Sequence, residues 1–496
     1  MKRIRFNAFA MNAAVHQSPG LWRHPANRSH EYTRLGYWTE LAQLLERGLF
    51  DGIFLADVTG VYDVHNASPD AALRGGVQVP LDDPMLLVPA MAQVTRHLGF
   101  GITASTSYEQ PALFARRMTT LDHLTDGRVG WNIVTSYLDS AARNAGQVKQ
   151  TSHDERYDRA DEFLQVVYKL WETSWDDDAV PRDAARNVYA DPAKVHSIGH
   201  NGRWFSVPGI HLCEPSPQRT PVLYQAGTSA RGLAFAAAHA ECVFLIAPTQ
   251  TALARQVAEV RAAVARAGRA PESVLIYAMA TVITDADDAS AAAKHADYRG
   301  YVDIDASLAL LSGWTGVDFG AVPLDATIEY FDTDAGRTAL AAFSKADPSR
   351  RWTVREAAEF IAIGGRGPVI VGGPQAVADQ LQDWVASTGI DGFNLAYAIA
   401  PGSWADVVEH VVPELQRRGA YATNYGAGPL RERLFGHAAL AADHSGGRLR
   451  DAVRAARADA DADAAATVNV ATARAQIPGS HRDAAPTHAD HAIETP

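Results

Sequence analysis

The 496-residue sequence has only two cysteines, Cys213 and Cys242, and they do not form a Cys-x-x-Cys pair. A disulfide framework or a cysteine-based zinc site is therefore not expected, and a reducing cytoplasm fits this composition. Long apolar runs are also missing, since none approaches the roughly 18 residues that a membrane span needs. The N-terminal residues lack the apolar core of a signal peptide. We therefore expect a cytoplasmic chain with no membrane partner.

Blocks of basic residues are absent too, and the formal net charge is −12. An acidic chain without lysine or arginine clusters is a poor partner for nucleic acid. The sequence contains no Gly-x-Ser-x-Gly, His-Glu-x-x-His, Walker A or Gly-x-Gly-x-x-Gly motif. It therefore gives no support to hydrolase, zinc or P-loop chemistry, and we expect no metal site.

What the chain does contain is a regular alternation of strand-like and helix-like segments. Apolar residues make up 47% of the sequence, which is enough for a large core. Strands are expected at 3–11, 50–57, 99–107, 128–136, 221–227, 242–247, 274–284 and 392–399, each followed by a helical pattern. Eight repeated βα units favour an α/β fold, a closed (β/α)8 TIM barrel. An open doubly wound sheet is the alternative.

Three regions depart from this rhythm. Residues 286–350 are expected to be an insertion in the barrel, which could act as a lid over the site. A β-hairpin is expected at 195–212, with Asn201-Gly202 as a two-residue turn. The composition changes at 436, because the remaining residues are rich in alanine and contain no aromatic side chain. We expect a barrel domain over 1–435 and a low-complexity, mostly disordered tail over 436–496, with a short helix near 449–460.

Several polar residues fall where parallel α/β proteins carry their chemistry, at the C-terminal ends of strands. Asp57 ends a buried strand, where it could contact a ligand or cap the next turn. Thr103 and Asn132 lie near the ends of the next two strands, although threonine is also an ordinary strand residue. Ser229 follows Ala226-Gly227 at a strand-to-helix turn, where it could hold a phosphate or only cap the helix.

Taken together, these segments resemble the flavin-dependent monooxygenases of the bacterial luciferase superfamily. The resemblance is to the branch that contains nitrilotriacetate monooxygenase component A, dibenzothiophene sulfone monooxygenase and long-chain alkane monooxygenase. The matching strings are GLWRHP (20–25), FDGIFLAD (50–57), GFGITASTSYEQP (99–111), RRMTTLDHLTDGRVGWNIVTS (116–136), HDERYDRADEF (153–163), PVLYQAGTSARG (221–232) and DGFNLAY (391–397). They occur in the expected order between about residues 4 and 420, so the tail lies outside the resemblance.

The resemblance implies a two-component enzyme that uses reduced FMN and O2 to oxygenate a small organic substrate through a flavin (hydro)peroxide. A separate NAD(P)H:flavin reductase would supply the reduced flavin. A homodimer or homotetramer would be usual for such a protein. The rival functions are an F420-dependent oxidoreductase on the same scaffold and a non-catalytic flavin-binding protein.

The resemblance also implies roles for individual residues. The cofactor contacts would be Asp57, Thr103, Asn132, His153, Tyr157, Ala226, Gly227 and Ser229, with Thr103 and Asn132 at the flavin ring and Tyr157 and Ser229 at the phosphate. The catalytic residues would be His16 and Tyr137, with Tyr62 and Gln78 in the substrate pocket. The loops expected to form this pocket hold few basic residues apart from Arg23 and Arg74, which disfavours a polyanionic substrate.

Overall fold

The computed structural model describes residues 2–329, 337–344 and 351–475. The chain divides into two compact units, Met1–Arg450 and Asp451–Pro496. Leu440 and His444 are buried in the first unit. The expected helix near 449–460 lies within α17 (Ser445–Ala475), and the expected disorder beyond 475 lies outside the described residues.

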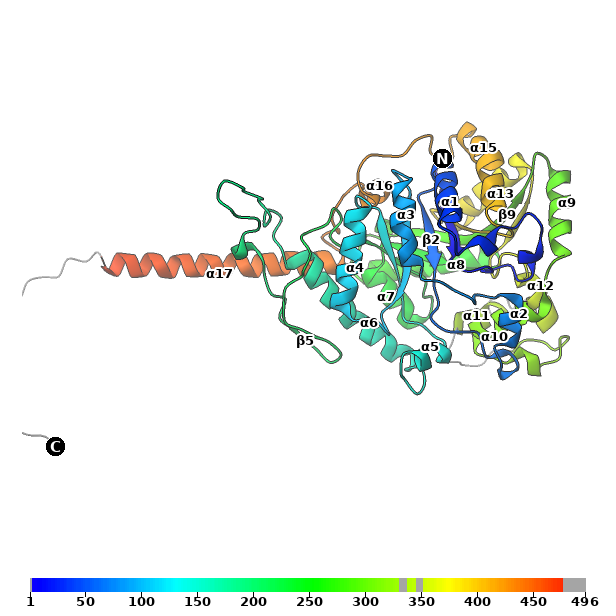
Figure 1. The fold of residues 1–496 in the computed structure, drawn as a ribbon, viewed down its shortest axis with the longest axis horizontal. Coiled ribbons are helices and arrows are strands. Elements are labelled where there is room, and N and C mark those ends of the chain that lie inside the picture. The colour runs from blue at the N-terminus through cyan, green and yellow to red at the C-terminus, as the bar shows by residue number, and fades with distance from the viewer. Residues whose placement is uncertain (1, 330–336, 345–350, 476–496) are drawn as a thin grey trace, which may run out of the picture. The chain divides into compact units, whose positions relative to one another are not determined.

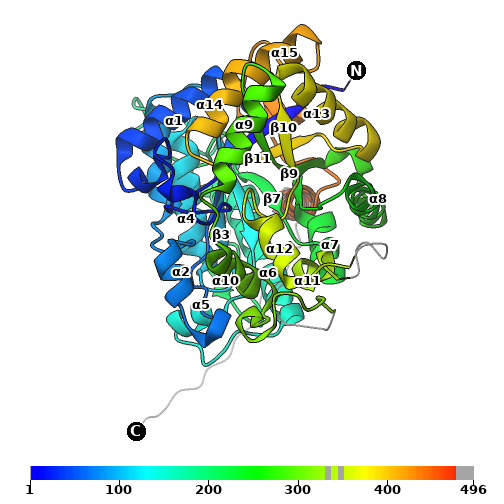
Figure 2. The same cartoon turned by 90° about the vertical axis from the view of Figure 1, so that its right-hand side faces the viewer.

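The first unit is built on a closed barrel of eight parallel strands, which confirms the predicted fold (Figures 1 and 2). The strands are β1 (Arg5–Met11), β2 (Gly52–Ala56), β3 (Gly99–Ser105), β4 (Val129–Val134), β7 (Val222–Gln225), β8 (Cys242–Leu245), β9 (Leu275–Thr284) and β11 (Gly392–Ala396). Each pairs in parallel with its neighbour, and the barrel closes where β11 pairs with β1, with Arg5 opposite Gly392.

Helices surround the strands on all sides (Figure 2). They are α1 (Leu35–Arg47), α3 (Val88–Gln93), α4 (Pro111–Leu124), α5 (Asp139–Asn144), α6 (His153–Tyr168), α7 (Ala230–His239), α8 (Gln250–Arg266), α13 (Pro374–Thr388), α14 (Gly402–Asp406), α15 (Val412–Arg417) and α16 (Leu430–Phe435). Residues 84–93 form a 3-10 turn at Pro84–Leu87 followed by α3 rather than one continuous helix. Among the described residues, no helix is long and apolar enough to cross a membrane.

The inside of the barrel is filled by aromatic side chains. The rings of Phe9, Phe54 and Phe244 pack with centroids 5.0–5.7 Å apart. Tyr224 and Tyr277 are buried in the same cluster. The barrel is therefore a packed core, and ligands can approach only from its ends.

The region expected to be an insertion contributes α9 (Asp288–Arg299), α10 (Ile304–Thr315), a 3-10 turn at Phe319–Ala321 and α11 (Arg337–Ala342), and α12 (Val354–Ile361) follows it. Its residues 330–336 and 345–350 lie outside the described part of the chain. Helix α10 packs against α2 (Asp70–Gly75), a short helix between β2 and β3. A side chain at Gly313 would overlap the ring of Tyr62, so the helix backbone lies directly against that ring.

Two local predictions are wrong. The hairpin strands β5 (His200–Asn201) and β6 (Ser206–Val207) pair Asn201 with Ser206, so the turn spans 202–205 rather than Asn201-Gly202. The carboxylate of Glu162 accepts hydrogen bonds from the backbone N–H groups of 203–205 and thereby sets this turn. A carboxylate 41–43 residues away along the chain, near the middle of α6, leaves no local signal in the turn sequence.

The second error concerns the glycine-rich stretch before α13, which the sequence predicts to be turns only. It contains β10 (Val369–Gly372), a ninth strand that pairs in parallel with Thr281–Thr284 of β9. Strand β9 is the longest of the sheet and extends past its pairing with β11, which gives this short strand a partner.

Candidate functional site

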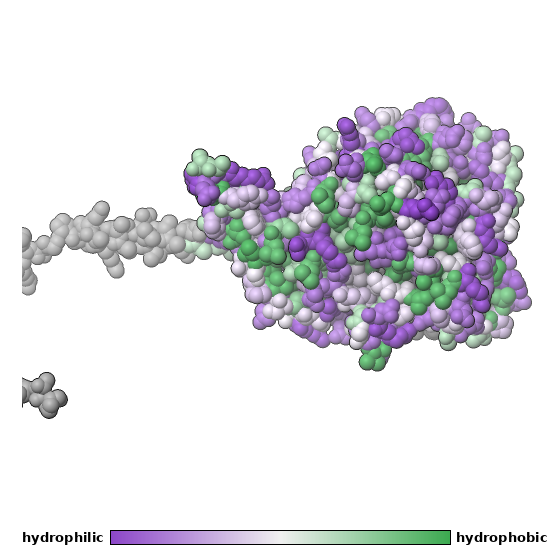
Figure 3. Space-filling model, viewed as in Figure 1, coloured by the Kyte–Doolittle hydropathy of each residue, from purple (hydrophilic) through white to green (hydrophobic). Residues whose placement is uncertain are grey.

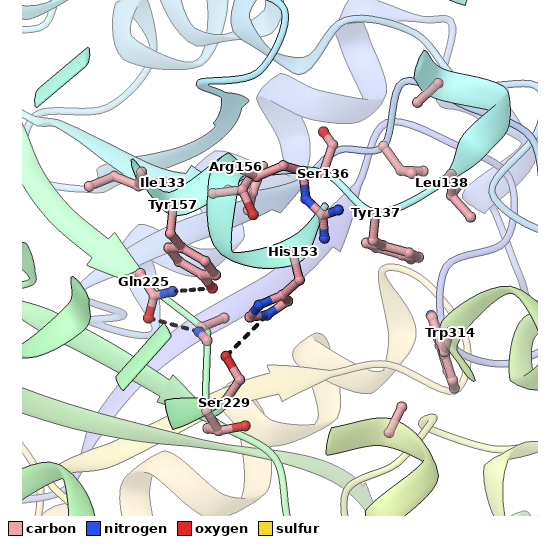
Figure 4. A pocket seen from close by; sticks show the side chains of 18 of the residues that line it. Ile133, Ser136, Tyr137, Leu138, His153, Arg156, Tyr157, Gln225, Ser229 and Trp314 are labelled. Atoms are coloured by element: carbon pink, nitrogen blue, oxygen red, sulfur yellow. Dashed lines mark hydrogen bonds between the residues drawn. The ribbon is translucent and has the colours of Figure 1, made fainter. Parts of the chain in front are cut away.

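A cavity of about 310 Å³ opens at the C-terminal ends of the strands (Figure 4). Its volume falls within the range of small-molecule sites, about 300–1,000 Å³. The residues that line it and that the sequence singled out are Asp57, Tyr137, His153, Tyr157, Ala226, Gly227 and Ser229. A second cavity, of about 450 Å³, shares Asp57 and Val58 with the first and is lined by Thr103 and Gln78.

One end of the first cavity is built on the start of α7. The Ser229 hydroxyl caps this helix by accepting a hydrogen bond from the backbone N–H of Gly232 at 3.1 Å. His153, the first residue of α6, places its Nε2 atom 3.1 Å from the Ser229 oxygen (Figure 4). Its Nδ1 atom lies 2.7 Å from the Asp154 carboxylate. A serine hydroxyl and an imidazole therefore meet at a helix N-terminus, where anions are favoured.

The backbone at this end has no room for additional side chains. A Cβ atom at Gly227 would lie 2.5 Å from the Tyr157 hydroxyl, and one at Gly232 would lie 2.7 Å from it. Gln225 fixes the approach, because its Oε1 atom accepts from the Gly227 N–H at 2.7 Å and its Nε2 atom lies 3.5 Å from the Tyr157 oxygen (Figure 4). Both glycines are thus needed for the close contact between β7, α7 and α6.

Thr103 and Asn132 form a buried polar pair on adjacent strands. The Asn132 Nδ2 atom donates to the Thr103 oxygen at 2.8 Å, and each side chain is only 5% exposed. The Asn132 Oδ1 atom is buried and accepts no hydrogen bond from any described residue. Because the Thr103 oxygen accepts from Asn132, its hydrogen is free to donate. The pair therefore offers one hydrogen-bond donor and one acceptor side by side. Leaving these two groups without partners in the protein interior costs free energy.

Asp57 lies between the two cavities. Burial, followed by the nearby Asp83 carboxylate, raises the pKa of Asp57 from its ordinary value of 3.8 to about 6. This carboxyl group consequently exchanges its proton much closer to neutral pH than an exposed aspartate does.

A chain of hydrogen bonds connects Tyr137 to the loop after β1. Gln78 donates through Nε2 to the backbone oxygen of His16 at 3.0 Å, and its Oε1 atom accepts from the Tyr62 hydroxyl at 3.0 Å. The Tyr62 and Tyr137 hydroxyl oxygens lie 2.7 Å apart. Burial raises the pKa of both tyrosines, so both carry their protons at neutral pH. Of these four residues, only Tyr137 lines the first cavity.

The side chain of His16 is packed into the top of the barrel core. It is 1% exposed, its ring centroid lies 4.4 Å from that of Phe9, and it lines neither cavity. Burial lowers the pKa of His16 to about 3, so the ring is neutral. The part of His16 that connects to the site is its backbone oxygen, through Gln78.

Among the residues of the cavity wall that were not singled out from the sequence are Arg156, Gln225, Trp314 and Arg366. The first two lie inside sequence strings that carried the resemblance. The assigned residues beside them in those strings were therefore the signal that could have identified them. Trp314 and Arg366 come from α10 and from the turn before β10, where the sequence pattern is irregular. Conversely, Arg23 and Arg74 line neither cavity; Arg23 donates to the Gly20 backbone at 3.1 Å, and Arg74 lies 3.8 Å from Asp305.

Comparison with known proteins identifies a matching family and several related chains. The family model described as luciferase-like monooxygenase matches residues 19–392. The dimethyl-sulfide monooxygenase of Hyphomicrobium sulfonivorans is 50% identical over 436 residues, which cover 88% of this chain and 91% of the relative. The long-chain alkane monooxygenase of Geobacillus thermodenitrificans is 48% identical over 452 residues, which cover 91% and 98%.

Solved structures agree with these relationships. The crystal structure of the Hyphomicrobium protein superposes with a TM-score of 0.85 over 91% of this chain and 96% of that chain. A riboflavin lyase solved with modified FMN and riboflavin is 38% identical, with a TM-score of 0.85 and coverage of 90% and 99%. An F420-dependent secondary alcohol dehydrogenase, at 14% identity and a TM-score of 0.53, shares the fold alone.

Proposed function

The chain belongs to the luciferase-like monooxygenase family, and from this premise we propose that it oxygenates a small organic substrate, with reduced FMN and O2, in the cavity between Ser229 and Tyr137. Its relatives at 48–50% identity are monooxygenases, and a relative at 38% holds a modified FMN. The observation that carries the proposal is a cavity with an anion-binding end at α7 and a tyrosine and tryptophan end opposite, which adjoins at Asp57 and Val58 a second cavity lined by Thr103 (Figure 4).

The α7 end fits the phosphate of FMN. The Ser229 hydroxyl, the His153 imidazole and the N-terminus of α7 converge there. Gly227 and Gly232 leave the backbone at this end without side chains. A phosphate would bind to exposed backbone N–H groups and to these side chains, as anions do at helix N-termini. The Tyr157 hydroxyl adds a further donor at the same end.

The Thr103–Asn132 pair fits the flavin ring. The pyrimidine part of a flavin has C=O and N–H groups in alternation along its edge. The free hydrogen of Thr103 would donate to a ring acceptor, and the unpaired Oδ1 atom of Asn132 would accept from a ring N–H. These contacts would satisfy the two buried groups that the protein itself leaves open.

Reduced FMN supplies the electrons that activate dioxygen, so that one oxygen atom reaches the substrate and the other leaves as water. The protein binds and orients the flavin and the substrate, and it excludes water from the cavity. Trp314 and Leu138 supply apolar walls beside Tyr137. Asp57 holds a proton on its carboxyl group up to about pH 6 and, among the described residues that line the cavity, is the one carboxylic acid available for proton transfer. His16 acts by holding Gln78 rather than by touching the substrate.

We propose that a separate NAD(P)H:flavin reductase supplies the reduced flavin. The sequence has no Gly-x-Gly-x-x-Gly fingerprint for a nicotinamide dinucleotide, so a second protein would carry that site. We also propose a homodimer or homotetramer. Tyr189 and Leu212 are 64% and 73% exposed, and Figure 3 shows hydrophobic patches among the hydrophilic surface. Sedimentation equilibrium measures the assembly directly.

The oxidised atom is proposed to be a thioether sulfur or an alkyl carbon, as the names of the two relatives at 48–50% identity suggest. The test is anaerobic titration of the protein with reduced FMN, followed by mixing with 18O2 and either a thioether or an alkane. We expect stoichiometric flavin binding and one 18O atom in the product. Failure to bind FMN in either redox state would overturn the proposal, and binding with only hydrogen peroxide as product across the panel would favour a non-catalytic flavin protein.

A further inference from the structure

Arg366 reaches the first cavity from a turn that the barrel holds rigidly. Gly364 and Gly365 precede it with φ of 75° and 71°, the left-handed conformation that favours glycine. The Gly364 N–H donates to the Ser18 hydroxyl at 3.0 Å, and a Cβ atom on Gly364 would overlap Thr281. The turn is therefore anchored to β9 and to the loop after β1. It fixes the backbone position from which the Arg366 side chain extends.

The guanidinium of Arg366 is packed but not paired. Its central carbon lies 5.0 Å from the centre of the Trp314 ring. Within the described part of the chain, it donates no hydrogen bond and forms no ion pair, although Tyr62 and Tyr137 are near enough to influence its pKa. An arginine carries five N–H donors and keeps its charge in proteins, so a half-buried guanidinium with no acceptor is costly.

The cavity does not provide the missing anion. Among the described residues that line it, Asp57 is the only carboxylate, and it forms no ion pair with Arg366. The phosphate of FMN is already assigned to Ser229 and His153 at the α7 end. Figure 4 shows Tyr137 and Trp314 displaced to the side away from Tyr157 and Gln225. No described residue of the cavity wall therefore supplies an anion to Arg366, which leaves that role to another bound molecule.

We infer that Arg366 binds an anionic group of the substrate, a carboxylate or a sulfonate, while the oxidised thioether or alkyl part lies in the remainder of the cavity. The planar fork of arginine matches two oxygens of such a group. Leu138, Ala141 and Ala339 line the same cavity and provide an apolar surface for the rest of the molecule. The inference rests on the proposed function and adds to it the chemical class of the substrate.

The test compares two probes of equal shape, 3-(methylthio)propanoate and its neutral amide, 3-(methylthio)propanamide. Each is titrated by calorimetry into protein saturated with oxidised FMN, so that the phosphate site is already filled. We expect the carboxylate to bind about tenfold more tightly than the amide, because charge-assisted hydrogen bonds are roughly twice as strong as neutral ones. In Arg366→Met the ratio should fall to about one, whereas Arg299→Met, on an exposed arginine that lines neither cavity, should keep it.

The outcomes separate this inference from the proposed function. FMN binding is measured first; if wild type does not bind FMN, the proposed function fails, and the same probe ratio on the flavin-free protein still decides the assignment of Arg366. Equal affinities in wild type, no binding of the carboxylate, or a preference that survives Arg366→Met would overturn it. Loss of FMN affinity in Arg366→Met would instead assign the arginine to the cofactor. If that variant does not fold, the wild-type ratio and Arg366→Lys, expected to keep part of the preference, provide the test.

Discussion

The hydroxyl oxygens of Tyr62 and Tyr137 lie 2.7 Å apart, and Gln78 fixes the direction of the hydrogen bond between them. The Gln78 amide donates to the His16 backbone, so its oxygen must accept from Tyr62. The single hydrogen of Tyr62 is thereby used, and Tyr137 must donate to Tyr62. The oxygen of Tyr137 then faces the cavity as an acceptor only, which suits a substrate or reaction partner that offers a hydrogen.

Replacing Tyr62 by phenylalanine should release the hydrogen of Tyr137 and leave the Gln78 oxygen buried without a donor. We expect kcat to fall by about 10- to 100-fold, within the range for loss of one positioned polar group. The free energy of unfolding should fall by about 1–3 kcal/mol because of the unsatisfied oxygen. Steady-state kinetics and urea unfolding measure the two effects.

The matched control is Tyr32→Phe. Tyr32 lies in the loop before α1 and lines neither cavity, and no hydrogen bond of its hydroxyl to a described residue is present. If Tyr62→Phe retained full kcat, the hydrogen-bond direction would have no catalytic importance.

Replacing Ser229 by alanine should weaken FMN binding by about tenfold, since it removes both a helix cap and a phosphate contact, each worth about 1 kcal/mol. Thr249→Ala separates the two effects. Thr249 caps α8 in the same way, with its hydroxyl accepting from the N–H of Ala252, but it does not line the cavity. Fluorescence titration with FMN should show a change for Ser229→Ala and none for Thr249→Ala. Equal FMN affinities in the two variants would show that Ser229 only caps its helix.

Replacing Asn132 by leucine should remove the acceptor proposed for the flavin ring. We expect FMN affinity to fall by about 10-fold, in line with roughly 1.5 kcal/mol for a buried hydrogen bond. The absorption spectrum of any flavin that binds should also shift. Asn394→Leu is the comparison, because Asn394 is a buried asparagine that accepts from Asn7 at 3.0 Å, whereas Asn132 pairs with Thr103 of the second cavity. That variant should lose stability but bind FMN normally; the opposite pattern would argue against a ring contact at Asn132.

Asp57→Asn should stabilise the flavin-free protein in a pH-dependent way. In the folded protein the pKa of Asp57 is raised from 3.8 to about 6, so between these values the folded state holds more protons than the unfolded state. The contribution of this group to stability is complete below pH 3.8 and is lost as the pH rises through 6. The corresponding cost above pH 7 is at most ~3 kcal/mol, and solvent in the cavity will reduce it.

Thermal unfolding at several pH values measures this effect. The gain in melting temperature for Asp57→Asn should be near zero at pH 4 and greatest above pH 7. Asp63→Asn provides the control, since Asp63 forms an ion pair with Arg143 at 2.6 Å and its replacement should not stabilise the protein at high pH. A gain that is constant with pH would contradict a raised pKa at Asp57.

The sequence predicts the barrel and identifies several residues that line the α7 end of the cavity, because both depend on local patterns. Alternating strands and periodic helices identify the βα units, and polar residues at strand ends, such as Asp57 and Ser229, mark the open face of the barrel. The roles of Trp314 and Arg366 could not be predicted in this way. Both come from segments without regular periodicity, and only the closed fold brings them to the cavity wall.

The errors have the same physical origin. The turn at 202–205 is set by Glu162, and β10 forms because β9 extends past its barrel partner. For His16 the resemblance implies a catalytic role, and the structure packs its ring against Phe9. In each case a tertiary contact decides what the local sequence leaves open.

The contact between Gly313 and the ring of Tyr62 restricts how this enzyme can diverge or be engineered. Helix α10 lies in the region that the sequence predicts to be an insertion, whereas Tyr62 belongs to the loop after β2, and their fit requires a residue without a side chain at 313. A chimera that exchanges the insertion with that of a relative will therefore disturb the Tyr62–Tyr137 hydrogen bond unless the donor segment also carries glycine at that position. We expect the two segments to change together during evolution and to determine substrate specificity jointly.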